Sequence, residues 1–438
     1  MKTLQEEDPE IFFNVQEELK RLKFELQMIP SENYASKAVL QACGTVFNNK
    51  YSEGYPGRRY YQGNKFVDNV ETLAIERAKK LFGAEHVNVQ TDSGSIANMA
   101  IYNALLKPGD KIMGLRLDMG GHLTHGHKVS ATAKYFTPVQ YDVDQKTELI
   151  DMNKVRALAL KEKPQIIVSG ATAYPRLFDF KAFHEIAEEV GAYSLADISH
   201  IAGLIAGNVH PSPFPFTDAV MTTTHKTLRG PRSAIIMCKK EDRLADVSGT
   251  QYIGMTEKQI AKIKDLAGKI DSSVFPGLQG GPHEHIIAAK AVAFKEALSP
   301  EFKNYAAQIV KNAKTLASSL MENGIKLVTN GTDNHLILID LRNFGIGLGK
   351  AAAVALEEAG FCTNCNTVPY DPSTPFKPSG VRIGTPAMTS RGMKESEMKQ
   401  VGEWMSAVLK DMNNKELKLK INEEVKELCR QFPIYQDL

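Results

Sequence analysis

Short apolar runs rich in β-branched residues alternate with helical patterns from about residue 70 onward. Near-continuous apolar runs of this kind are typical of parallel strands that helices cover on both faces. The pattern predicts an α/β fold in which the helices Ser95–Leu106 and Phe180–Val190 separate strands at His86–Gln90, Lys111–Leu117, Gln165–Ser169, Ala192–Asp197, Asp218–Thr223 and Ser233–Cys238. Polar residues fall at the ends of these strands, where open α/β sheets form binding sites.

A second region begins near Gly281, where long helical patterns lead to two further strands. The elements predicted there are helices His285–Ala297 and Pro300–Asn323 and strands His335–Asp340 and Val381–Gly384. We expect a smaller α+β domain over residues 282–438, after a large domain over residues 71–281. The charged stretch Glu241–Lys269 is predicted to be an excursion at the surface.

The first 70 residues differ from both regions. They contain a predicted helix, Ile11–Gln27, followed by a loop rich in Tyr and Gly with little core pattern. We therefore expect an N-terminal arm over residues 1–70 that needs a partner surface to pack against.

Composition excludes several classes of protein. The 438 residues are 43 % hydrophobic with a formal net charge of +2, and no basic stripe interleaved with aromatic residues indicates a nucleic-acid partner. The segment Met1–Asp8 lacks a signal pattern and no apolar stretch reaches the length of a membrane span, so we expect a cytoplasmic protein. Five cysteines are a sparse, odd set, and Cys362-x-x-Cys365 has no second pair at zinc-site spacing.

Lys226 is the residue most suited to covalent chemistry. It follows a predicted strand that ends in a run of threonines, and it precedes a Gly/Pro turn that Arg229 and Arg232 flank. Neighbouring cations would lower the pKa of its amine, which favours a Schiff base with an aldehyde cofactor or substrate. The alternative is an ordinary solvated lysine in a turn, so other residues must decide.

Pyridoxal phosphate requires a lysine, a carboxylate on its pyridine nitrogen, a phosphate cradle, a flat group against its ring and a cation for the substrate. Asp197, at the end of a predicted strand, suits the pyridine nitrogen, although this segment alone favours an Asp that caps the following turn. Ser93-Gly94-Ser95 opens a predicted helix and suits the phosphate, although it could be a plain N-cap.

Two further segments supply the remaining groups. The glycine-rich loop Gly120–His127 offers the flat ring of His122, and its three histidines have no carboxylate or cysteine in the same run, so no metal site is expected. Arg382 lies on an apolar strand of the second region, where a buried guanidinium needs an anion. Either a substrate carboxylate or an internal acidic residue would satisfy it.

Long strings of residues carry a resemblance to a known family over nearly the whole chain. They are Lys50-Tyr51-Ser52-Glu53-Gly54-Tyr55-Pro56-Gly57 with Arg59-Tyr60-Tyr61, Gly120–Gly126, Ala173-Tyr174-Pro175-Arg176, Thr222–Pro231, Phe275-Pro276-Gly277-Leu278-Gln279-Gly280-Gly281-Pro282, and Gly380–Pro386. In these strings the chain resembles serine hydroxymethyltransferase, a fold-type-I pyridoxal phosphate enzyme. The resemblance implies a large domain with a mostly parallel seven-stranded sheet between helices, and a smaller α+β domain.

The resemblance also implies the activity and the residues that hold the cofactor. The reaction would be the reversible transfer of the serine hydroxymethyl group to tetrahydrofolate, which gives glycine and 5,10-methylenetetrahydrofolate. Lys226 would carry pyridoxal phosphate, Asp197 would contact its pyridine nitrogen and His122 would stack on its ring. The remaining cofactor residues implied are Ser93, Gly94, Ser95, Thr172, His200, Thr223, Tyr51, Gly280 and Gly281, and His225 would line the same pocket as a catalytic residue with His200.

Substrate and subunit roles follow from the same resemblance. Arg382 and Ser31 would clamp the carboxylate of the amino acid, and Glu53 would be the proton shuttle. Tyr51, Glu53, Tyr61 and the Gly280-Gly281 turn would reach the site from a second subunit, so the active unit would be a homodimer that could pair into a tetramer. The residues implied for tetrahydrofolate are Tyr60, Leu117, Gly121, Leu123 and Asn366.

Several residues depart from the family pattern. Asp92 stands just before Ser-Gly-Ser, where its charge would repel a phosphate unless it turns away, and Thr172 and Ser199 replace a usual serine and alanine. His283-Glu284 replaces a more apolar pair. These changes keep open an alternative reaction, a folate-independent aldolase acting on threonine-like or α-methylated amino acids. A third hypothesis is a protein that is not an enzyme and only binds the cofactor or RNA.

Overall fold

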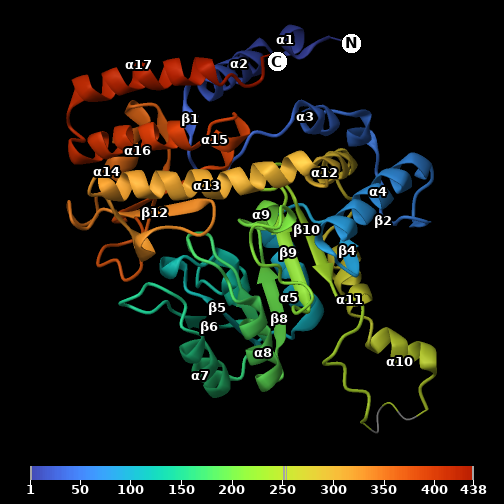
Figure 1. Ribbon diagram of the computed structural model, residues 1–438. Helices are drawn as coiled ribbons and strands as arrows, with labels where there is room; N and C mark the ends of the chain where they lie inside the picture. The colour runs from blue at the N-terminus through green and yellow to red at the C-terminus, as the bar shows by residue number, and fades with distance from the viewer. Residues whose placement is uncertain (1, 250–251, 253, 437–438) are drawn as a thin grey trace. The chain divides into compact units, whose positions relative to one another are not determined.

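The computed structural model describes residues 2–249, 252 and 254–436 (Figure 1). The chain forms two compact units, one made of Ala35–Ala307 and the other of Met1–Tyr34 with Gln308–Leu438. These units follow other boundaries than the segments 1–70, 71–281 and 282–438 expected from the sequence. The role of residues 1–70 as an arm between subunits stays a prediction.

A seven-stranded sheet forms the centre of the unit Ala35–Ala307 (Figure 1). Its strand order is β4-β10-β9-β8-β7-β5-β6. Strand β10 runs antiparallel to β4 and β9, whereas the pairs β9–β8, β8–β7, β7–β5 and β5–β6 are parallel. The strands are β4 (His86–Asn88), β5 (Lys111–Leu115), β6 (Thr137–Tyr141), β7 (Ile166–Ser169), β8 (Tyr193–Asp197), β9 (Ala219–Thr223) and β10 (Ala234–Cys238). The prediction of an α/β fold with a mostly parallel sheet is confirmed.

For this seven-stranded sheet, the strand predictions are correct to within two residues at each end, with one omission. Strand β6 was not predicted, because Thr137 and Pro138 are exposed and interrupt the apolar pattern. The strand lies at the edge of the sheet, where proline is tolerated because one side of the strand needs no hydrogen bonds.

Helices cover this sheet and bury its apolar side chains. Ala97, Ala100 and Ile101 of helix α5 are fully buried in one core cluster with Leu195 and Met221 of the sheet. Full burial of one such aliphatic side chain stabilises the fold by roughly 1.5–3 kcal/mol. The other elements of this unit are α3 (Lys37–Cys43), α4 (Lys65–Phe82), α5 (Gly94–Leu105), α6 (Thr132–Tyr135), α7 (Met152–Glu162), α8 (Phe180–Val190), α9 (Ala202–Ala206), α10 (Glu257–Ile263), α11 (Leu266–Ser272), α12 (Glu284–Ala297) and the hairpin β2 (Gly54–Tyr55) and β3 (Arg58–Arg59).

The carboxyl ends of the parallel strands bring distant segments to one edge of the sheet. Asp197 pairs with Met221 in the β8–β9 register, so the ends of these two strands are neighbours. The loops that leave this edge contain Ser93 after β4, His122 after β5 and Thr172 after β7. The sheet therefore collects candidate residues that are far apart in the sequence.

The second unit has its own antiparallel sheet, in the order β11-β12-β15-β14. Its elements are β11 (Lys326–Leu327), β12 (Leu336–Asp340), β14 (Asn364–Asn366), β15 (Gly380–Gly384), β1 (Leu26–Gln27), β13 (Phe361–Cys362), α1 (Leu4–Glu7), α2 (Pro9–Phe24), α14 (Gly349–Glu358), α15 (Pro386–Ser390), α16 (Glu395–Lys410) and α17 (Lys415–Gln431), and α13 (Pro300–Glu322) contains the boundary between the units. This sheet with its helices agrees with the predicted α+β region.

The N-terminal segment contributes to the core of this second unit. Leu26, Met28 and Tyr34 are buried in the same cluster as residues of the C-terminal sheet and helices. The expectation that residues 1–70 contain little core is therefore wrong for this segment. The helix predicted over Ile11–Gln27 ends at Phe24, because Leu26 and Gln27 form strand β1 beside β13.

The segment Glu241–Lys269 is only partly an excursion at the surface. Its helix α10 projects from the rest of the unit in Figure 1 and buries no side chain. The two ends are anchored, because the buried carboxylate of Asp242 accepts a hydrogen bond from the Tyr193 hydroxyl at 2.9 Å and forms an ion pair with Lys269.

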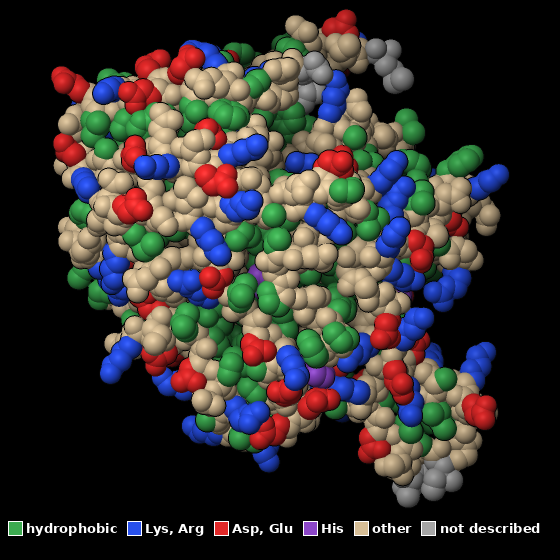
Figure 2. All heavy atoms as spheres, in the orientation of Figure 1, with side chains coloured by type: hydrophobic (Ala, Val, Ile, Leu, Met, Phe, Trp, Pro, Cys, Tyr) green, Lys and Arg blue, Asp and Glu red, His purple; other side chains and the backbone are tan. Residues whose placement is uncertain are grey.

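Figure 2 shows basic and acidic side chains interspersed over the face in view. Within the described part of the chain, none of the helices combines the length and the apolar character that crossing a membrane requires.

Candidate active site

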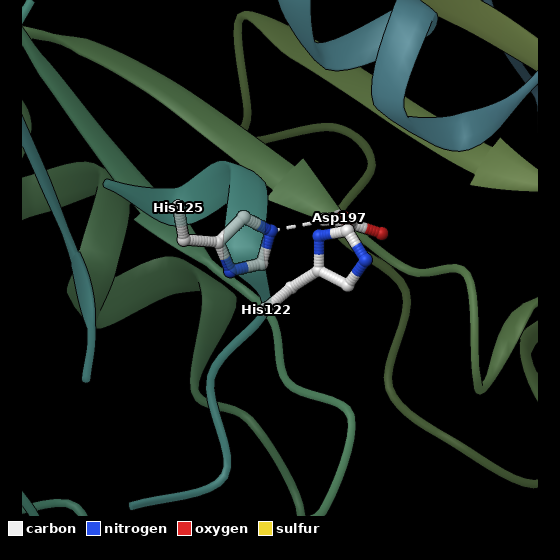
Figure 3. Close-up of side chains that lie close together, drawn as sticks. All are labelled: His122, His125 and Asp197. Atoms are coloured by element: carbon white, nitrogen blue, oxygen red, sulfur yellow. Dashed lines mark hydrogen bonds and ion pairs between the residues drawn. The ribbon is translucent and has the colours of Figure 1, made fainter. Parts of the chain in front are cut away.

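Asp197 is a buried carboxylate at the carboxyl end of β8, with 8 % of its surface exposed. Its Oδ2 accepts a hydrogen bond from His125 Nε2 at 2.9 Å (Figure 3). The same oxygen accepts a hydrogen bond from Asn98 Nδ2 at 3.1 Å, and Oδ1 accepts one from the Ser199 amide at 3.1 Å. Although burial acts to raise the pKa of Asp197, the bonds and charge of His125 hold it well below its usual range. Asp197 is therefore an anion held ready for a protonated partner.

His122 lies beside this pair and is held in one tautomer (Figure 3). Its Nδ1 accepts a hydrogen bond from the Thr124 amide at 3.2 Å, so the ring proton is on Nε2. Burial, and then the nearby His125, lower the pKa of His122 to about 4. The ring is therefore neutral at physiological pH, as a flat stacking group should be.

His125 is the member of this group whose role sequence reasoning missed. The ring is 1 % exposed, and the potential ligand atoms of His122, His125 and Asp197 all lie within 4.8 Å of one another. The three-histidine spacing drew attention to the loop, but nothing in the sequence showed that His125 pairs with Asp197. The carboxylate that the loop itself lacks comes from a different strand.

The predicted phosphate cradle opens helix α5. Ser93 is the N-cap residue and its side chain makes no capping hydrogen bond, so its hydroxyl is not used by the helix. A Cβ atom at Gly94 would lie 2.8 Å from Cγ2 of Thr223, so only glycine fits there without a shift. The helix N-terminus, with hydroxyls at Ser93 and Ser95, suits an anion.

Lys226 lies in the connection between β9 and β10. Its Nζ donates to Thr223 Oγ1 at 3.1 Å, and the Thr223 amide donates to Ser199 Oγ at 3.1 Å. Ser199 in turn donates its amide to Asp197. A short series of hydrogen-bonded residues thus joins the lysine to the buried carboxylate.

His225 and His200, predicted to line the same pocket as Lys226, are both described by the structure. Burial, and then Lys226, lower the pKa of His225 to about 3, and its buried Nδ1 has no hydrogen-bond partner among the described residues. His200 is buried and its carbonyl accepts the Thr227 hydroxyl at 2.8 Å.

The loop after β5 contains three of the residues predicted to bind folate, Leu117, Gly121 and Leu123. A Cβ atom at Gly121 would lie 1.9 Å from the carbonyl oxygen of Leu115, so the close approach of the loop to β5 requires glycine. Thr172 Oγ1 donates to the Gly121 carbonyl at 2.9 Å. Leu117 and Leu123 lie in short 3-10 turns on either side of this glycine, and Leu123 is exposed.

The residues predicted to serve a second subunit form a separate group. The Tyr51 hydroxyl donates a hydrogen bond to Glu53 Oε1 at 3.2 Å. The rings of Tyr51 and Tyr61 pack edge to face, with their centroids 5.3 Å apart. Cβ atoms at Gly280 and Gly281 would come within 3.4 Å of Glu53 and Tyr51, so the glycines allow this approach. Tyr60, predicted to contact folate, is 75 % exposed and packs on Phe275.

Three predicted ligand-binding residues belong to the other unit. Arg382 on β15 donates from Nε to Asn364 Oδ1 at 3.1 Å, and burial lowers the pKa of its guanidinium to about 10. Pro30, which precedes Ser31, lies against Gly384 on the same strand. Asn366 lies on β14, which pairs with β15. Their predicted ligands stay predictions.

The departures from the family pattern have structural partners. Asp92 does not cap α5, whose N-cap residue is Ser93. Its carboxylate lies 3.4 Å from Nδ1 of His283, which is itself a departure. The Ser199 hydroxyl accepts from Thr223, and Thr172 binds the Gly121 carbonyl. Thr172 and Ser199 thus reinforce the site.

The residues present fit pyridoxal phosphate on four observations. Four features lie at one edge of the sheet: a buried anion, a neutral ring, a helix N-terminus whose Ser93 hydroxyl makes no capping bond, and a lysine linked to the anion. The unpartnered Nδ1 of His225 is a further polar atom that a bound group would satisfy.

Comparison with known proteins agrees with this geometry. A family model described as serine hydroxymethyltransferase matches residues 4–405. The chain is 52 % identical to a serine hydroxymethyltransferase of Methanospirillum hungatei over 100 % of both chains. It is 50 % identical to one of Acidobacterium capsulatum and 52 % identical to one of Desulfotalea psychrophila, in each case over 99 % of this chain and 96 % of the relative. The chain therefore belongs to the serine hydroxymethyltransferase family.

Proposed function

We propose that this protein transfers the hydroxymethyl group of serine to tetrahydrofolate, giving glycine and 5,10-methylenetetrahydrofolate, with pyridoxal phosphate as cofactor. The observation that carries the proposal is the hydrogen-bonded series from Lys226 through Thr223 and Ser199 to the buried anion Asp197. The full-length match to relatives of this name supports the folate-dependent reaction over the folate-independent aldolase.

The site residues divide the work of holding the cofactor. Lys226 would bind the aldehyde carbon, and Ser93, Gly94 and Ser95 would bind the phosphate. When bound, pyridoxal phosphate accepts the electron pair that is released when a bond to the substrate α-carbon breaks. Asp197 stays ionised, so it keeps the proton on the pyridine nitrogen that makes the ring an electron acceptor.

Glu53 is the proposed proton carrier. It must take the proton of the serine hydroxyl as the carbon–carbon bond breaks and return it to the reacting groups later. Tyr51 donates a hydrogen bond to Glu53 Oε1, which orients the carboxylate. The Arg382 guanidinium is proposed to bind the carboxylate of the amino acid, because burial disfavours its charge unless an anion approaches.

A homodimer is the proposed active assembly. Val46, Tyr51, Tyr60, Tyr61 and Phe66 are exposed by 82 %, 54 %, 75 %, 45 % and 68 % of their surface, although they are large and apolar. A second copy of the chain would cover such a surface and would receive Tyr51, Glu53 and Tyr61 in its site. Location in the cytoplasm remains a proposal from the sequence alone.

The proposed reaction is tested directly with serine and tetrahydrofolate. The wild-type protein should form glycine and 5,10-methylenetetrahydrofolate in equal amounts, and Glu53→Gln should lower kcat by about 10²–10⁴, the usual contribution of a general acid–base group. Glu53→Gln should keep the visible absorption of the bound cofactor. Serine cleavage by the wild type at the same rate without folate would instead indicate an aldolase.

A shared site is tested by mixing two variants of low activity. Lys226→Ala and Glu53→Gln should each have at most about a hundredth of wild-type activity. Subunits refolded together should recover about one quarter of wild-type activity, because about half of the dimers would be mixed and each mixed dimer would hold one complete site. Activity is measured after mixing equal amounts. Mixed dimers that form but show no activity would place Lys226 and Glu53 in the same subunit's site.

A further inference from the structure

A cluster of buried charges lies beneath the loop that contains Glu53. Arg59, Glu71 and Glu284 have side chains that are 4 %, 1 % and 0 % exposed, and Lys290 is 1 % exposed. These residues come from the hairpin strand β3 and the helices α4 and α12. No role in the reaction proposed above requires them to be charged.

Arg59 holds the loop through its backbone. Its Nη1 donates to the carbonyls of Ser52 and Gly54, each at 2.8 Å, so the guanidinium brackets Glu53 from both sides. The rest of the guanidinium is bound by carboxylates, Asp68 at 2.9 Å on Nε and Glu71 at 2.5 Å on Nη2. Since four of the five N–H groups of the guanidinium are bound in this way, its orientation is fixed.

Glu284 holds the same loop through a side chain. The Ser52 hydroxyl donates to Glu284 Oε1 at 2.5 Å, and this oxygen lies 3.8 Å from Nη2 of Arg59. Both residues are buried, and α12 is thereby joined to the residue that precedes Glu53. Glu284 begins α12 three residues after Gly281, so the same segment contacts Tyr51 and Ser52.

Charges of both signs face the buried Glu284 carboxyl group. Asp68 and Glu71 on α4 oppose it, whereas Arg59 on β3 and Lys290 on α12 attract it. Burial, and then Glu71, raise the pKa of Glu284 to about 7. Its Oε2 is buried without a hydrogen-bond partner among the described residues. A group kept at such a cost is expected to have a role that an apolar residue cannot fill.

We propose that Glu284 is a positioning residue for Glu53: by accepting the Ser52 hydroxyl inside the buried charge cluster, it fixes the loop that presents Tyr51 and Glu53 to the reaction. This inference rests on the proposed role of Glu53 in serine cleavage. Glu284 touches neither substrate nor cofactor in the proposal and acts through Ser52 and Arg59.

The buried state of Glu284 is tested by the pH dependence of stability. A carboxyl group whose pKa is raised by folding stabilises the fold below its unfolded pKa, and this contribution is lost as pH rises from 4.5 to about 7. Glu284→Gln cannot ionise, so its melting temperature relative to wild type should increase from about pH 5 to about pH 8. Glu296→Gln, on the same helix, supplies the reference. A constant difference between Glu284→Gln and wild type over this range would contradict the buried site.

The positioning role is tested by comparing two reactions of the same holoenzyme. Glu284→Leu and Ser52→Ala should each lower kcat for folate-dependent serine cleavage by about tenfold or more, as an error of about 1 Å in a catalytic group does. Both variants should retain the visible absorption of the bound cofactor. They should also exchange the α-proton of glycine with solvent at the wild-type rate, because the proposal does not assign this reaction to Glu53. Glu284→Gln keeps an acceptor for Ser52 and should restore most of the cleavage.

Matched variants separate this claim from a general weakening of α12. Glu296 on α12 accepts the Ser36 hydroxyl at 2.6 Å, a similar pair away from Glu53, so Glu296→Leu and Ser36→Ala should leave both reactions unchanged. The double variant Ser52→Ala/Glu284→Leu should be no slower than the slower single variant, because both remove one interaction.

Each outcome decides the proposal. Equal losses in cleavage and exchange, or no rescue by Glu284→Gln, would overturn the role of Glu284. If Glu284→Leu does not fold, the rates of serine cleavage and of glycine α-proton exchange in Ser52→Ala test the positioning role on their own. Full activity of Glu53→Gln would instead overturn the proposed function, which is a distinguishable result.

Discussion

The buried carboxylate of Asp197 is the group on which the rest of the site depends. A carboxylate taken out of water is tolerated only when donors surround it, and the chain supplies His125, Asn98 and the Ser199 amide. These donors hold Asp197 ionised, and Ser199 extends the network to Thr223 beside Lys226. The charge needed at one end of the cofactor and the amine needed at the other are therefore set by one connected structure.

A second set of buried charges serves the loop of Glu53. Arg59 binds the carbonyls on both sides of Glu53, and Glu284 binds the hydroxyl of Ser52. The two networks solve different problems, because the first stabilises a charge and the second fixes a backbone. Both use polar groups in the protein interior, where each group must find its partner and alternative arrangements are costly.

The sequence predicted much of the sheet and of the site, since strand ends and glycine-rich loops have local signatures. It did not predict strand β6, whose Pro138 interrupts the apolar pattern, or strand β1, which exists only through its pairing with Phe361 and Cys362. The pair His125–Asp197 and the contact Ser52–Glu284 join residues 72 and 232 positions apart, so no spacing in the sequence indicates them. The role of Glu53 came from the family resemblance, whereas the apolar strand around Arg382 indicated a need for an anion but not which anion.

The central claim is that Lys226 carries the cofactor in front of Asp197. Reduction of the holoenzyme with borohydride fixes the bond between lysine and cofactor, and mass spectrometry of the digested protein then identifies the modified residue. The account predicts that the pyridoxyl group is found on Lys226, in the peptide that follows strand β9. A pyridoxyl group on any other lysine, or none on Lys226, would contradict it.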